Sequence, residues 1–106
     1  MNWQQQAVQF AQHHHCQHTP PVHALDLVSE VGELCKVWLE ASHYGTITPQ
    51  YPPEMAEEFG DVLYSLCLLA EACTVDLDAA FQAALVKYEQ RWQAKGDIGS
   101  HATLDN

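Results

Sequence analysis

The stretch Glu57–Ala70, EEFGDVLYSLCLLA, decides the fold of this 106-residue chain. Its apolar residues recur at the spacing of a helix, and its second half, from Val62 onward, is apolar nearly all the way round. A helix of that kind is buried on more than one side. In so short a chain, this pattern indicates that oligomerisation completes the fold.

Outward from this stretch, three more segments show helical periodicity, and none shows the sustained alternation of a strand. We predict four helices, over about residues 2–16, 21–41, 53–73 and 76–95. Prolines separate the first three, and Gly96 ends the last. The predicted fold is an all-α four-helix bundle that forms one domain, residues 1–95, with a loose tail over 96–106.

Each predicted helix should bury an apolar face. On the first helix this face contains Trp3 and Phe10, and on the second it contains Leu25, Val28 and Trp38. No two cysteines have CxxC spacing, so we expect all four to be small core residues of a cytoplasmic protein: Cys16, Cys35, Cys67 and Cys73.

The charge balance excludes several kinds of partner. Fourteen Asp and Glu residues face four Lys and Arg residues, which gives a net charge of −10. A nucleic-acid backbone or an anionic membrane needs a basic surface, so neither is an expected partner. The N-terminal residues do not resemble a signal peptide, and no apolar run is long enough to span a membrane.

Two acidic pairs lie in the second and third helices. Glu30 and Glu33 are three residues apart, as are Glu58 and Asp61, so each pair shares a helix face beside apolar residues. Antiparallel packing of the two helices would bring the pairs face to face, where like charges repel. A hard divalent cation removes that cost, and oxygen ligands favour Mg²⁺, with Mn²⁺ as the alternative. The pairs therefore predict a divalent metal site.

The sequence contains two other patterns that are associated with metal sites, and neither fits well. A di-iron carboxylate bundle needs Glu-x-x-His motifs, and neither acidic pair has a His at that offset. The run His13–Cys16 resembles a metal-binding tract in composition, but consecutive helix positions point in different directions. We interpret the run as a partly exposed end of the first helix.

The acidic motifs and their surroundings resemble the MazG-like nucleoside triphosphate pyrophosphohydrolases, of the all-α NTP pyrophosphatase superfamily. The resemblance rests on LVSEVGELCK (27–36), EEFGDVLYSLCLLA (57–70) and KYEQR (87–91), within about residues 18–92. It implies a Mg²⁺-dependent homo-oligomer, a dimer or a dimer of dimers. It also implies cleavage of a nucleoside triphosphate to the monophosphate and diphosphate, in nucleotide-pool house-cleaning.

The resemblance also implies roles for single residues. The expected metal ligands are Glu30, Glu33, Glu58 and Asp61. Glu33 and Glu57 are the catalytic candidates, because a carboxylate orients or deprotonates the attacking water. The phosphate-binding candidates are Lys87, Arg91 and Lys36; Lys36 is equally interpreted as a salt-bridge partner of Glu40. A basic residue that the family often carries before the second acidic motif is missing from Pro53–Ala56.

The base-binding residues are less defined by the sequence. The segment 18–34 resembles the entry segment of the deoxycytidine-triphosphate-type members, which makes His18 and Trp38 the base-binding candidates. The other possible stacking partners are Trp3, Phe10, Tyr44 and Tyr64. Two alternative functions stay open: phosphoribosyl-ATP pyrophosphohydrolase, and a catalytically silent bundle that binds metal or nucleotide.

Overall fold

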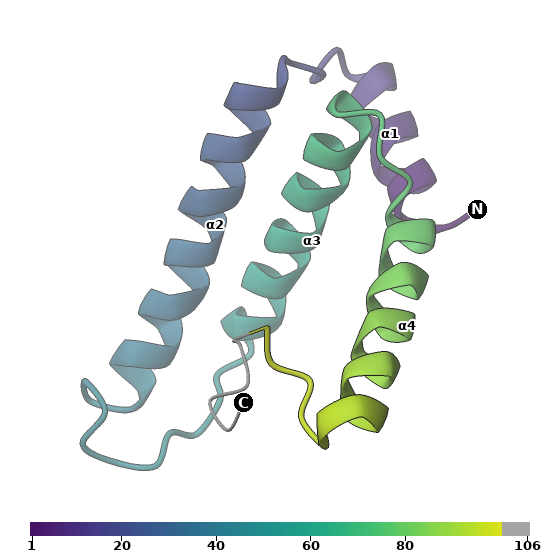
Figure 1. Ribbon diagram of the computed structural model, residues 1–106. Coiled ribbons are helices and arrows are strands. Elements are labelled where there is room, and N and C mark those ends of the chain that lie inside the picture. The colour runs from purple at the N-terminus through teal and green to yellow at the C-terminus, as the bar shows by residue number, and fades with distance from the viewer. Residues whose placement is uncertain (101–106) are drawn as a thin grey trace. The chain divides into compact units, whose positions relative to one another are not determined.

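The computed structural model describes residues 1–100, which contain four α-helices and no strand (Figure 1). The helices are α1 (Trp3–His13), α2 (Pro20–Ala41), α3 (Glu54–Ala72) and α4 (Leu77–Lys95). The predicted all-α class is confirmed, and α2 to α4 begin and end within one residue of the predicted bounds. The first helix is shorter than predicted, because the chain leaves helical geometry after His13 and His15 has a positive φ of 56°.

Two units make up the chain, residues 1–75 and residues 76–106. In the first unit, α3 lies between α1 and α2 and packs against both (Figure 1). The side chains that α3 buries come from the half that the sequence shows to be apolar all round: Ser65, Cys67, Leu68 and Ala70. The all-round pattern thus marks the helix that has neighbours on two sides.

Side-chain caps define several helix ends. At the start of α1, the backbone N–H of Gln5 donates to the side chain of Asn2, and the side chain of Gln5 accepts from the backbone N–H of Asn2. At the end of α2, the buried hydroxyl of Ser42 donates to the carbonyl of Leu39 and accepts from the N–H of Gly45. Prolines occupy the first turn of α2, where their missing N–H costs no helical hydrogen bond.

A buried glutamine ties α1 to the end of α3. The side-chain amide of Gln4 donates to the carbonyl of Val75 at 2.7 Å and to the carboxylate of Glu71 at 3.4 Å. Farther along α1, Phe10 packs edge-on against Tyr64 of α3, with ring centroids 6.0 Å apart. These two contacts show that α1 runs antiparallel to α3.

The second unit contains α4. Asp76 caps its first turn by accepting from the N–H groups of Asp78 and Ala79, and Gly96 ends it with a positive φ of 69°. The guanidinium of Arg91 donates to the carbonyl of Ile98. The described part of the predicted loose tail is therefore hydrogen-bonded to α4, and residues 101–106 lie outside the described residues.

Several expectations about the core are wrong for the single chain. Leu25 and Val28 are 71% and 69% exposed, and Trp3 is 70% exposed. Periodicity identifies an apolar stripe, but it does not say which of two neighbouring stripes faces α3. Among the cysteines, Cys67 is a core residue, Cys16 is half-buried, and Cys35 and Cys73 are exposed. Burial raises the pKa of the Cys67 thiol, so this thiol stays protonated.

Candidate functional site

The antiparallel packing of α2 and α3 brings carboxylates from both helices together. Glu30 of α2 and the pair Glu58 and Asp61 of α3 offer carboxylate oxygens that all lie within 4.8 Å of one another. Within residues 1–100, this is the one group of three acidic, His or Cys side chains close enough to hold an ion. Glu30 and Glu58 are half-buried, and Asp61 is exposed.

The local sequence explains why these acids meet. On α2, the residues that share the side of Glu30 are Leu27, Leu34 and Val37, all half-buried, so packing of this apolar side carries Glu30 toward α3. On α3, the half-buried Val62 places the neighbouring Glu58 and Asp61 at the border of the packed surface. Each carboxylate thus lies at the edge of the surface between α2 and α3, where it is close to the other helix and also accessible to solvent.

Electrostatics show that the other two acids are also near. Burial, followed by the negative charges of Asp61, Glu30, Glu33 and Glu57, raises the pKa of the Glu58 carboxyl above its ordinary value of 4.5. Glu33 and Glu57 are themselves exposed. Four neighbouring acids therefore act on the carboxyl of Glu58, which lies at the centre of the group.

The donor set fits a hard cation. Mg²⁺ binds oxygen ligands at about 2.0–2.1 Å in octahedral geometry, so two ligands of one ion lie about 3 Å apart when adjacent and about 4 Å apart when opposite. Three oxygens within 4.8 Å need only small side-chain adjustments to reach that spacing. A divalent charge would also relieve the repulsion that raises the pKa of Glu58. In contrast, softer metals prefer imidazole or thiolate, and the cluster contains neither.

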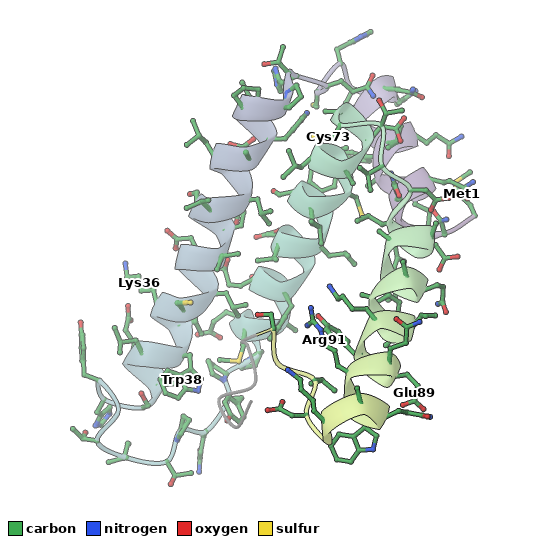
Figure 2. The ribbon with its side chains drawn as sticks, viewed as in Figure 1. Met1, Lys36, Trp38, Cys73, Glu89 and Arg91 are labelled. Carbon is green, nitrogen blue, oxygen red and sulfur yellow. The ribbon has the colours of Figure 1, made fainter. Side chains whose placement is uncertain are left out.

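The phosphate-binding candidates lie on two different units. Lys36 is exposed on α2 and points away from α3 (Figure 2), so the structure does not bring it into the carboxylate cluster. Lys87 and Arg91 are four residues apart on α4. The ammonium of Lys87 lies 5.2 Å from the ring centroid of Tyr88, a cation–π contact. Arg91 uses one N–H on Ile98 and keeps further donors for another partner.

One chain does not bring the two base-binding candidates together. His18 precedes α2, where its backbone N–H donates to the buried imidazole of His23 at 3.0 Å. Trp38 lies near the opposite end of α2 and is 45% exposed. A helix rises about 1.5 Å per residue, so roughly 27 Å separates them. Both residues could contact one base only if two chains supplied them.

Three of the other aromatic candidates line a pocket that the sequence did not reveal. The pocket has a volume of about 270 Å³ and lies between α1 and α3; it is lined in part by Trp3, Phe10 and Tyr64. The α3 residues that line it include Gly60 and Cys67, which at 100° per residue lie about 160° and 180° around α3 from Glu58.

Comparison with known proteins gives one finding about the chain as a whole. A family model, the MazG nucleotide pyrophosphohydrolase domain, matches residues 19–94, more than half of the chain. The matched region includes the whole carboxylate cluster and all of α4 except Lys95. No curated protein and no solved structure matched the chain.

Proposed function

The chain belongs to the MazG nucleotide pyrophosphohydrolase family, and we propose that it is a Mg²⁺-dependent enzyme that hydrolyses nucleoside triphosphates to the monophosphate and diphosphate. The observation that carries this proposal is the convergence of Glu30, Glu58 and Asp61 from two helices. The same reaction suits house-cleaning of the nucleotide pool, with ribo- or deoxyribonucleoside triphosphates as substrates.

The carboxylate cluster would hold the metal through Glu30, Glu58 and Asp61, with Glu33 as a further ligand. Bound there, Mg²⁺ would neutralise phosphate charge and lower the pKa of a coordinated water. The acids themselves repel a triphosphate, so we expect little substrate binding in the absence of the divalent ion.

The remaining acids are suited to the proton transfer. In the proposed step, a water oxygen bonds to the α-phosphorus, the bond to the bridging oxygen breaks, and diphosphate leaves. Glu33 and Glu57 are exposed and lie within electrostatic range of Glu58. Either carboxylate could orient the water and accept its proton. Lys87 and Arg91 would bind phosphate oxygens, since Arg offers a planar fork of donors and Lys a point charge.

An exposed apolar stripe on α2 supports self-association. Residues spaced alternately by three and four positions recur along it: Val28, Val31, Cys35 and Trp38. Such spacing forms a continuous seam for a second helix, and exposed apolar seams mark interaction surfaces. We propose a homodimer or a dimer of dimers in which this stripe is covered. Sedimentation at increasing concentration should show the oligomer, and Val28→Glu should dissociate it; a monomer of 11.9 kDa at every concentration would contradict it.

Two further features concern where in the cell the protein acts. A lipid bilayer could not be spanned by any helix within residues 1–100, because none combines the length and apolarity that a crossing needs. All four cysteines are free thiols, which suits the reducing cytoplasm that we propose as the location.

The enzymatic proposal is tested by diphosphate release from a panel of nucleoside triphosphates, with Mg²⁺ and with a chelator. Phosphoribosyl-ATP belongs in the same panel. If it is hydrolysed and no nucleoside triphosphate is, the activity is that of the phosphoribosyl-ATP pyrophosphohydrolase of histidine synthesis. We expect Mg²⁺-dependent release of diphosphate from at least one nucleoside triphosphate. Nucleotide binding without any release of diphosphate would contradict the enzymatic proposal and indicate a silent binding protein.

A further inference from the structure

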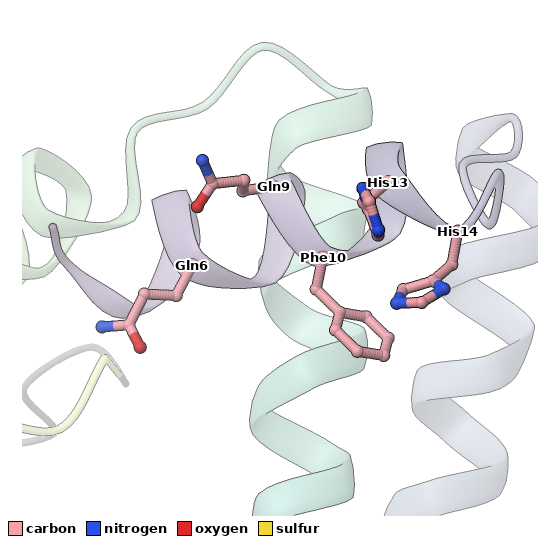
Figure 3. A pocket seen from close by; sticks show the side chains of 5 residues that line it. All are labelled: Gln6, Gln9, Phe10, His13 and His14. Carbon is pink, nitrogen blue, oxygen red and sulfur yellow. The ribbon is translucent and has the colours of Figure 1, made fainter.

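The C-terminal end of α1 carries two imidazoles that the proposed reaction does not use. His13 is the last residue of α1, and His14 is its C-cap. Their ring centroids lie 4.8 Å apart, and the two ring planes are perpendicular. Both rings line an open pocket of about 470 Å³, with Gln6, Gln9 and Phe10 along the preceding turns (Figure 3).

This approach of the rings differs from what the sequence predicts. Consecutive residues of a regular helix point about 100° apart, which separates their side chains. His14 has left helical geometry, however, with φ of −103° and ψ of 10°. The side chain of His14 therefore does not follow the direction of a regular helical residue, and a helical pattern extended through residue 16 does not specify its direction.

The spacing of the two rings allows shared coordination of one ion. Zn²⁺ binds imidazole nitrogens at about 2.0–2.1 Å, and two imidazoles at a near-tetrahedral angle then have ring centroids about 5 Å apart. The observed 4.8 Å is close to that value. We propose that His13 and His14 form a second metal site, separate from the carboxylates, for a borderline transition-metal ion such as Zn²⁺, with water in the remaining positions.

The surroundings hold one of the two ligands in place. The ring of His14 lies 4.5 Å from the ring of Phe10, and Phe10 in turn packs against Tyr64 of α3. These contacts restrain the side chain of His14, so metal binding would cost less side-chain conformational entropy. The end of α1 also favours a cation, because the last carbonyls of a helix carry partial negative charge.

The two proposed sites differ in ligand chemistry. Imidazole is a ligand for Zn²⁺, Cu²⁺ or Ni²⁺ and not for Mg²⁺, whereas the carboxylate cluster suits the harder ion. Millimolar Mg²⁺ should therefore occupy the carboxylates without competing at the histidines. Because protons compete with the metal for imidazole nitrogens, Zn²⁺ affinity at this site should fall on acidification.

The experiment titrates Zn²⁺ into the full chain in excess Mg²⁺, with imidazole ¹⁵N resonances and equilibrium dialysis as the measurements. We expect the ring nitrogens of His13 and His14 to shift together and to saturate at one ion. Either His13→Gln or His14→Gln should lower the affinity of this site by at least about tenfold, and His15→Asn, the matched control, should leave it within twofold.

Two outcomes would overturn the proposal. One is Zn²⁺ binding that leaves the resonances of His13 and His14 unshifted, which would place the ion on the thiols or carboxylates. The other is an equal loss of affinity in His15→Asn, which would show a diffuse histidine tract and no defined pair. Neither outcome bears on diphosphate release.

Discussion

The helices α3 and α4 have equal lengths of 19 residues but differ in how much they bury. Four residues of α3 are buried, whereas α4 buries none and exposes large apolar residues such as Phe81 and Trp92. A helix with neighbours on two sides can bring charged groups into contact and perturb them, as Glu58 shows. On α4, the ammonium of Lys87 contacts the ring of Tyr88, and the guanidinium of Arg91 donates to the carbonyl of Ile98. Each helix thus supplies a different part of the proposed chemistry.

The largest expected effect is on stability, and it separates the two helices directly. Leu68 of α3 is 4% exposed, so Leu68→Ala should lower the free energy of unfolding by about 2–5 kcal/mol. Leu85 of α4 is 45% exposed, so Leu85→Ala should cost the monomer about 0.5 kcal/mol or less. Urea unfolding at low protein concentration measures both, and equal losses would show that α4 is packed as tightly as α3.

The next effect is on catalysis. Glu58→Gln keeps the shape of the side chain and removes a charged metal ligand from the centre of the cluster. Diphosphate release should fall about a hundredfold or more. Glu40→Gln removes the same charge from an exposed position on α2 and serves as the control, with activity expected to be unchanged. Full activity of Glu58→Gln would show that Glu58 is not a metal ligand.

A smaller effect is expected from the basic residues of α4. Arg91→Ala and Lys87→Ala should each raise KM about tenfold, since a charge-assisted contact to phosphate contributes about 1.5 kcal/mol or more. Gln90→Ala, on the same helix, is the control. Steady-state kinetics with saturating Mg²⁺ measure the change, and an unaltered KM in both basic variants would assign triphosphate binding to other residues.

The smallest effect concerns pH. Because the pKa of Glu58 is raised in the folded chain, the folded state binds more protons than the unfolded state just above pH 4.5. The stability contributed by this group is present at lower pH and is lost as pH rises through the folded pKa. Thermal melts of metal-free protein should show this loss, and Glu58→Gln should reduce it. A melting temperature of the wild-type chain that rises as pH increases above 4.5 would contradict the raised pKa of Glu58.

The acidic cluster could be predicted from the sequence because one helical spacing and one connection between helices determine it. Spacing of three puts each pair on one face, and the loop 42–53 lets α2 and α3 pack antiparallel, so Glu30 meets Glu58 and Asp61. The exposure of Val28 could not be predicted in this way, because α2 has two apolar stripes and only packing shows which one α3 covers. The approach of His13 and His14 depends on dihedral angles at a helix end, which periodicity does not specify.

The most direct test of the carboxylate site is Mn²⁺ binding, measured by electron paramagnetic resonance, to the wild-type chain and to Asp61→Asn. Mn²⁺ should bind the wild-type chain and be displaced by Mg²⁺, since both ions favour oxygen ligands. Asp61→Asn should bind Mn²⁺ at least about tenfold more weakly. Equal Mn²⁺ affinity in the two proteins would contradict a metal site built from Glu30, Glu58 and Asp61.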